Sequence, residues 1–165
     1  MKKLASAGVI VLGLAACSNN VAATVNGDDI TLDEVRQVTA DIADGTGTQV
    51  SVQALLPIMI LAESALPAVR AEGISPSEQS VATVEQELGL TDGDYSEETK
   101  KVVDFYAINY DARSSLDMAE EYRVLNESIV NAEVSVNERF GTWNGEMGQI
   151  EPTLRDYLAQ VPASE

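Results

Sequence analysis

The stretch VAATVNGDDITLDEV (residues 21–35) predicts a strand, a tight turn, a return strand and a capped helix in immediate succession. Val21 to Val25 is a short β-prone run, and the pair Asn26-Gly27 is the strongest short signal for a two-residue hairpin. Thr31 and Glu34 have the spacing of a capping box, in which each side chain bonds to the other's backbone amide. A helix is therefore expected from Thr31, with one apolar face formed by Leu32, Val35, Val38 and Ile42.

The next segment predicts a buried helix. Gly45 and Gly47 are expected to end the first helix in a loop, and residues 51–72 follow. The middle of this segment has nine consecutive residues without a charge, which is too short a run for a membrane span. Pro57 and Pro67 each remove a helical hydrogen bond, so a kink or a restart is expected at each of them.

Gly73 is expected to end the helix at residues 51–72, and two more helices are predicted after it. Ser75 is the expected N-cap of the first, with Pro76 at the first helical position and Glu78 completing a capping box. From Ser96 to about Ala132 a single helix of about 50 Å is expected, because apolar residues recur there every three or four positions. Its stripe comprises Phe105, Ile108, Ala112, Leu116, Ala119, Tyr122, Leu125 and Ile129.

The C-terminal part predicts a strand and then a tail. Residues 133–139 alternate as a strand does, with Val134 and Val136 on one side. Residues 152–165 are expected to form one short helix around Leu154 and Leu158, followed by disorder.

The acidic stretch at residues 92–98 does not fit a calcium-binding EF-hand loop. An EF-hand loop needs glycine at its sixth position, and this sequence has Glu97 there. A turn followed by a helix N-terminus is the better interpretation, since a serine N-cap and acids in the first turn stabilise that end of a helix.

The first seventeen residues have the pattern of a bacterial lipoprotein signal. Lys2 and Lys3 are followed by about a dozen mainly apolar residues, and Leu14-Ala15-Ala16 leads into Cys17, the one cysteine of the chain. This pattern predicts removal of residues 1–16 and attachment of diacylglycerol to the Cys17 thiol. Two alternatives stay open: a permanent anchor, which would need about 20 apolar residues, and an ordinary cleaved signal with an incidental cysteine.

Composition restricts the function classes. The net charge of −17 would become −19 once Lys2 and Lys3 are removed, so the surface should repel nucleic acid. The chain has no histidine, which excludes Ser-His-Asp and Cys-His nucleophiles and the usual zinc ligand sets. No phosphate-cradling glycine loop is present either. We expect one acidic domain without cofactor or metal.

Three groups of residues resemble the SurA and trigger-factor-like N-terminal chaperone domain. The first is the opening strand, turn and capped helix at residues 21–35, and the second is the helix junction Ala71 to Ser75 with Glu78. The third is similar to the end of lipoprotein members from actinobacteria and comprises Val134, Val136, Asn137, Arg139, Phe140, Gly141 and Trp143. The resemblance implies a mainly helical domain whose first and last strands pair in antiparallel fashion, and a role in holding unfolded secreted proteins. Only 22 residues follow Trp143, so the parvulin isomerase domain of many relatives is not expected.

The predicted protein is therefore a non-enzymatic holdase, lipid-anchored to the extracytoplasmic side of a cell membrane. Its expected organisation is a signal peptide at 1–16, a lipidated cysteine and tether at 17–20, and a SurA N-terminal-like domain at 21–165. The candidate client-binding side chains are Met59, Tyr106, Tyr110, Met118, Phe140 and Trp143. Each of them is individually more typical of a core.

Two other function classes stay open. An adaptor lipoprotein could use the same apolar patch to dock one envelope partner, and its acidic surface would suit a basic partner. A carboxylate enzyme would need two acids facing each other across a cleft. Clients are expected to be unfolded polypeptides, and the sequence leaves the oligomeric state open.

Overall fold

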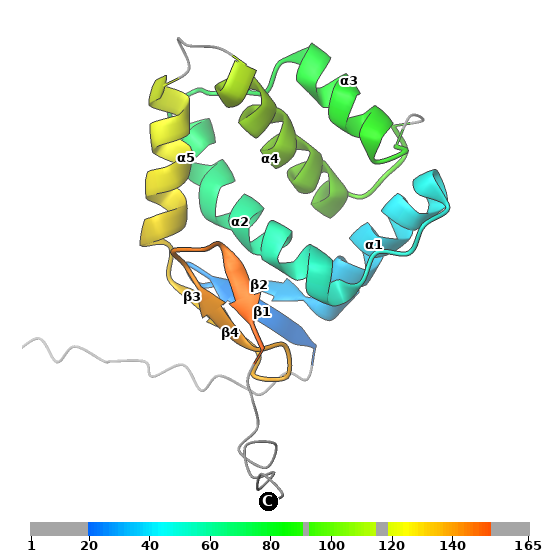
Figure 1. Cartoon of the computed structure of the whole chain (residues 1–165), viewed down its shortest axis with the longest axis vertical. Helices are drawn as coiled ribbons and strands as arrows, with labels where there is room; N and C mark the ends of the chain where they lie inside the picture. Colours follow the sequence, from blue (N-terminus) through cyan, green and yellow to red (C-terminus); the bar gives the residue numbers. More distant parts are fainter. Residues whose placement is uncertain (1–19, 91–92, 115–118, 153–165) are drawn as a thin grey trace, which may run out of the picture.

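A computed structural model describes residues 20–90, 93–114 and 119–152 of the chain. In that part, five helices and five short strands form a mainly helical fold with two small antiparallel sheets (Figure 1). The elements are β1 Val21–Val25, β2 Asp28–Thr31, α1 Leu32–Thr46, α2 Val52–Ala71, α3 Glu78–Glu87, α4 Glu97–Ser114, α5 Ala119–Asn131, β3 Val134–Val136, β4 Thr142–Asn144 and β5 Gln149–Glu151. The expected signal peptide, Cys17, Met118 and the tail helix lie outside the described residues.

The N-terminal stretch folds as the sequence predicts. Asn26 and Gly27 both have positive φ, 53° and 98°, which suits the right-handed twist of the β1–β2 hairpin. The capping box is complete, because the Glu34 amide donates to Thr31 Oγ1 at 3.3 Å and the Thr31 amide donates to Glu34 Oε2 at 2.6 Å. Helix α1 continues through Gly45 and ends at Gly47, whose φ of 68° makes it the left-handed cap. Gly45 therefore does not end the helix.

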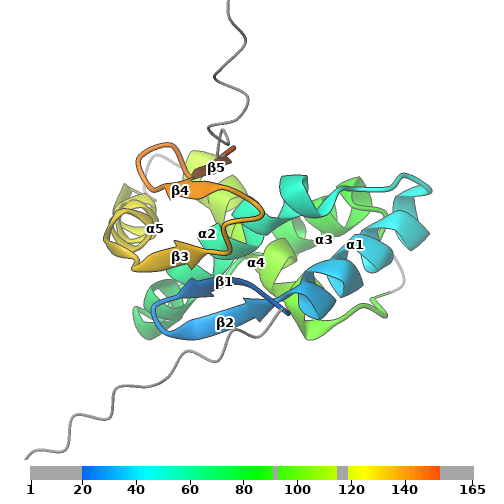
Figure 2. The same ribbon diagram turned by 90° about the horizontal axis from the view of Figure 1, so that it is seen from below.

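The predicted pairing of the strand Val21–Val25 with the strand Val134–Val136 is confirmed. β1 lies between β2 and β3, and it pairs antiparallel with β3 in the register Ala23 to Val136 and Val25 to Val134. Asn26 extends this ladder at one end, where its amide donates to the Glu133 carbonyl at 2.8 Å. A second small sheet, the β4–β5 hairpin, contacts β3 (Figure 2). The pairing thus joins chain segments that lie more than 100 residues apart in the sequence.

Helix α2 is the central element of the fold. Its Leu55, Leu56 and Ile60 pack with the sheet and α1, whereas Ala65 and Leu66 pack with α4 and α5. By length and composition α2 could span a membrane, yet half of its most apolar window is buried against the rest of the domain. The helix is continuous through both internal prolines, so no restart occurs at either one.

The long helix predicted over residues 96–132 is instead two helices, α4 and α5. In one continuous helix Phe105 and Leu125 would lie about 30 Å apart at 1.5 Å per residue. Both belong instead to one cluster with Leu66 of α2, because the chain folds back between them. Folding back lets both halves of the apolar stripe bury against the same core helix, which a single helix could not do.

Two aspartates hold the N-termini of helices to which they do not belong. Asp41 on α1 accepts hydrogen bonds from the Ser96 amide, the Ser96 hydroxyl and the Thr99 hydroxyl, at 2.9, 2.7 and 2.6 Å, at the start of α4. Asp111 on α4 accepts in the same way from the amide and the hydroxyl of Ser77. These bonds fix the helix starts and link neighbouring helices.

The contact between Asp111 and Ser77 explains why α3 starts later than the sequence predicts. The N-cap is Ser77, not Ser75, and the helix begins at Glu78. Because Asp111 holds both polar groups of Ser77, that residue stays in an extended conformation with ψ of 147°, and Pro76 precedes the cap. A tertiary contact therefore decides the boundary. At α4 the predicted serine cap is present, since the Thr99 amide donates to Ser96 Oγ.

We predict that Asp41→Asn lowers the free energy of unfolding at pH 7 by about 1.5–3 kcal/mol, the usual range for hydrogen bonds to a charged group. Burial raises the pKa of Asp41, but hydrogen bonds from Thr99, Ser96 and Gln37 outweigh it and lower that pKa below its ordinary value. The stabilisation is thus complete above the unfolded-state pKa of about 3.9 and is lost as the pH falls towards the lower folded-state pKa.

Urea unfolding of wild type and variant at several pH values checks this prediction. The difference between the two proteins should shrink below about pH 4, where the unfolded-state carboxyl protonates. Asp44→Asn is the matched control, because Asp44 is an exposed aspartate on the same helix and should change stability by less than about 0.5 kcal/mol. A difference between Asp41→Asn and wild type that is the same at pH 7 and pH 3 would contradict the explanation.

Candidate functional site: an apolar groove beside helices α4 and α5

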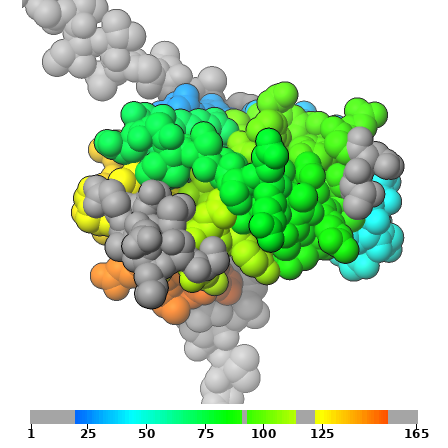
Figure 3. All heavy atoms as spheres, turned by 90° about the horizontal axis from the view of Figure 1, so that it is seen from above, coloured from blue at the N-terminus to red at the C-terminus, as the bar shows by residue number. Residues whose placement is uncertain are grey.

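A groove of about 860 Å³ lies between α4 and α5, with Leu61 of α2 at its base and the β4–β5 turn at one end. In the space-filling view, α4 is visible between α3 and α5 (Figure 3). The fold-back of the predicted long helix creates this groove, since it brings two faces of one sequence stripe opposite each other. The groove is thus a direct consequence of the corrected topology.

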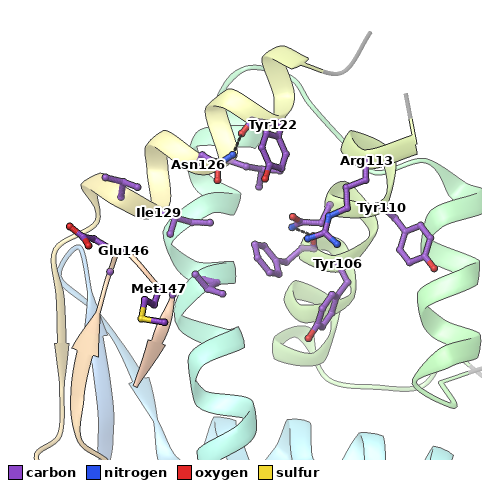
Figure 4. A pocket seen from close by; sticks show the side chains of 15 residues that line it. Tyr106, Tyr110, Arg113, Tyr122, Asn126, Ile129, Glu146 and Met147 are labelled. Carbon is purple, nitrogen blue, oxygen red and sulfur yellow. Dashed lines mark hydrogen bonds between the residues drawn. The ribbon is translucent and has the colours of Figure 1, made fainter. Parts of the chain in front are cut away.

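Each wall of the groove follows helical spacing. On α4 the lining residues Tyr106, Asn109, Tyr110 and Arg113 recur at intervals of three, one and three, which places them on one face. On α5 the lining residues are Tyr122, Leu125, Asn126, Ile129 and Val130. Figure 4 shows Tyr106 and Arg113 of α4 across from the α5 row, Tyr110 turned toward α3, and Met147 of the β4–β5 turn below α5.

All the large hydrophobic side chains that are exposed in the described part of the chain line this one groove. They are Tyr110, Tyr122, Val130 and Met147, with exposed fractions of 47, 46, 68 and 65 %. Isolated exposed apolar residues are normal on a protein surface, but a contiguous apolar patch typically marks a binding site. The concentration of all four in one concave region therefore distinguishes it from the remaining surface.

The polar groups of the groove are mostly occupied within their own helices. Asn109 Nδ2 donates to the Phe105 carbonyl at 2.9 Å, and Asn126 Nδ2 donates to the Tyr122 carbonyl at 2.8 Å (Figure 4). The Tyr110 hydroxyl donates to Glu87 of α3 at 3.2 Å. Burial raises the pKa of Tyr106 above its ordinary value, so this phenol stays neutral at physiological pH. The walls therefore present mainly rings and alkyl groups, with the Arg113 guanidinium among them on the α4 side.

The structure separates the predicted client-binding residues into two sets. Tyr106 and Tyr110 line the groove, as a client-facing role requires. Met59 is 5 % exposed and packs in the core with the sheet, so it is not available to a client. Phe140 and Trp143 are half-buried against that same core and do not line the groove. Both side chains therefore contribute to the packing at the sheet end of the domain.

Sequence reasoning predicted only Tyr106 and Tyr110 among the groove residues; it missed Arg113 and the exposed apolar side chains of Tyr122, Val130 and Met147. A usable signal existed for α5, because Tyr122, Asn126 and Val130 are spaced by four and so share a helix face. In one long helix, however, the face with Tyr122, Asn126 and Val130 would have no second helix opposite it to form a groove. Met147 had no local signal, since only the tertiary contact of the β4–β5 turn brings it to the groove.

The described residues offer little support for carboxylate catalysis or for a metal site. The one buried carboxylate there, Asp104, pairs with Arg70 and Lys100 at 3.1 Å each, which links α2 to α4. A glycosidase needs two carboxylates that face each other across a cleft. Glu85 lines the same pocket as Asp104, but it accepts a hydrogen bond from the Tyr95 hydroxyl at 2.6 Å, and Asp104 is held by its two cations. Within residues 20–90, 93–114 and 119–152, no group of three acidic or cysteine side chains could hold a metal ion.

Comparison of the chain with protein-family models, curated proteins and solved structures found no match.

Proposed function

We propose that this protein is a membrane-anchored extracytoplasmic holdase of the SurA-like kind, which binds apolar segments of unfolded polypeptides in the groove between α4 and α5. One observation carries the proposal: in the described part of the chain, every exposed large hydrophobic side chain lines this groove. Burial of apolar surface is non-directional and supplies about 25 cal/mol per Å², so such a surface suits clients of varied sequence.

The charge of the chain supports the same role. A protein that holds aggregation-prone segments must keep the loaded complex in solution, and a net charge of −17 opposes association between complexes. The groove contains tyrosines and a methionine, whose side chains adapt to differently shaped partners. Holding is passive in this account, without a nucleotide and without catalysis.

The anchor in this proposal is the lipid on Cys17. The three residues between Cys17 and Val21 span at most about 11 Å, so β1 would be held close to the lipid headgroups. The sheet and the α3–α4 side of the domain lie at opposite ends in Figure 1. The β4–β5 turn at one end of the groove would then lie on the membrane side, and the other end, at the last turn of α4, would lie farther from the membrane, where a secreted chain can reach it.

We predict that the full-length protein suppresses aggregation of several unrelated unfolded proteins at near-stoichiometric ratios. The triple variant Tyr110→Ser, Tyr122→Ser and Met147→Ser should need about tenfold more protein for the same protection, since each replacement removes exposed apolar surface. Light scattering of urea-diluted substrates measures this. The melting temperature should change little because these side chains are about half exposed or more.

A matched triple variant separates apolar contact from other effects. Tyr110→Phe, Tyr122→Phe and Met147→Leu keep the apolar groove and remove the hydroxyls and the sulfur, so protection should persist. Protection that is equal in the serine variant and the wild type would contradict the proposal. Recovery of a single envelope protein, without protection of any unfolded substrate, would favour the adaptor function instead.

A further inference from the structure

The groove contains one cation whose environment differs from that of the other cations in the structure. Arg113 is exposed in the last turn of α4 and lines the groove. In the described part of the chain it makes no ion pair or hydrogen bond. The other described lysines and arginines all have partners: Arg36, Arg70, Lys100, Lys101 and Arg123 pair with carboxylates, and Arg139 lies over the Phe140 ring.

This lack of a partner is unusual because carboxylates are abundant in the chain. The sequence has 27 acidic residues against 10 basic ones, yet among the described residues that line the groove only Arg113 and Glu146 are charged. Figure 4 shows them on opposite sides, with Arg113 on the α4 side beside the tyrosines and Glu146 at the β4–β5 turn. The α4 wall thus presents a guanidinium next to aromatic rings, in a protein that is otherwise strongly acidic.

We propose that the groove prefers polypeptide segments in which an acidic side chain stands next to the apolar run, and that Arg113 binds this carboxylate. This inference rests on the proposed function, because the apolar run must occupy the groove. The guanidinium group offers paired N–H donors that match a carboxylate, and the adjacent apolar walls exclude water and strengthen the ion pair. Charge complementarity would therefore add an orientation to a contact that apolar burial alone leaves non-directional.

If Arg113 only stabilised the C-terminal end of α4, its substitution would have a different effect. A cation in the last turn of a helix interacts favourably with the helix dipole, and lysine serves that role as well as arginine. Arg113→Lys keeps that charge and loses the planar fork, so a loss of acid preference in this variant with unchanged stability points to carboxylate binding. If the position served the helix alone, Lys and Arg would bind all ligands equally.

The test uses the full-length protein and three fluorescent ten-residue peptides that share one apolar core. The residue beside the core is Glu, Gln or Lys, and both peptide ends are blocked, so a terminal carboxylate plays no part. Fluorescence anisotropy should show the Glu peptide binding about fivefold more tightly than the Gln peptide, as expected for a partly exposed ion pair. Added salt should reduce this ratio and leave binding of the Gln peptide intact.

Three variants of the protein test whether Arg113 causes the preference for the Glu peptide. Arg113→Gln should abolish it without weakening the Gln peptide, and Arg113→Glu should transfer it to the Lys peptide. Arg36→Gln removes the same charge from α1, outside the groove, and should retain the preference. Equal binding of the Glu and Gln peptides to wild type, or a preference that survives in Arg113→Gln, would overturn this inference alone. Failure of all three peptides to bind would overturn the proposed function as well.

Discussion

Replacing Gly45 by alanine is expected to destabilise the protein by about 2–3 kcal/mol, the range of a steric overlap in a packed region. The direction is the opposite of the usual one, because alanine in a helix normally gains about 0.5–1 kcal/mol over glycine. Gly45 lies inside α1, and a Cβ there would stand 2.6 Å from the Gly89 carbonyl carbon, closer than side chains approach a backbone. The two glycines therefore allow the end of α1 to contact the loop after α3.

Two further variants separate this overlap from backbone strain. Gly89 and Gly73 both have a left-handed φ, 70° and 73°, but a Cβ on Gly73 would meet nothing within 4 Å. Gly73→Ala should lose about 1–2 kcal/mol for the conformation alone. Gly89→Ala should lose more, because its Cβ would stand 2.6 Å from the Gly45 carbonyl oxygen. Urea unfolding followed by circular dichroism measures all three. A Gly45→Ala protein as stable as wild type would contradict this account of the contact.

Local patterns were sufficient where the structure is stabilised locally. The hairpin at Asn26-Gly27 and the capping box at Thr31 and Glu34 need only neighbouring residues, and both are present. The pairing of β1 with β3 is a long-range feature, and it came from the family resemblance rather than from the spacing of residues. The register of that pairing still had to come from the structure.

Prediction from sequence was wrong where a tertiary contact decides the outcome. The apolar stripe between residues 96 and 132 continues across the break, so periodicity alone could not separate α4 from α5. Ser114, Ser115 and Asp117 offered a weak signal, since serine and aspartate compete with helical hydrogen bonds. Ser77 became the N-cap of α3 because of Asp111, more than 30 residues away.

The candidate site could be predicted only in part for the same reason. Tyr106 and Tyr110 were predicted because aromatic and methionine side chains suit a client-binding surface, and both tyrosines do line the groove. Met59 has the same chemistry but lies in the core, and sequence does not distinguish the two environments. The opposite wall of the groove exists only after the chain folds back at the end of α4.

Site-specific crosslinking can show whether unfolded polypeptides occupy the groove between α4 and α5. A photoreactive amino acid is placed at Val130, which is the most exposed apolar residue of the groove, and in a second protein at Gln79, an exposed position on α3 outside it. Each full-length protein is illuminated with several unrelated proteins freshly diluted from urea, and again with their native forms.

The account predicts covalent adducts from Val130 with every unfolded substrate, far fewer with the native forms, and none above background from Gln79. The same adducts should decrease when an apolar peptide competes for the groove, because both ligands bury the same surface. Equal adduct yields from Val130 and Gln79, or yields from Val130 that do not depend on whether the substrate is unfolded, would contradict the claim that this groove holds unfolded chains.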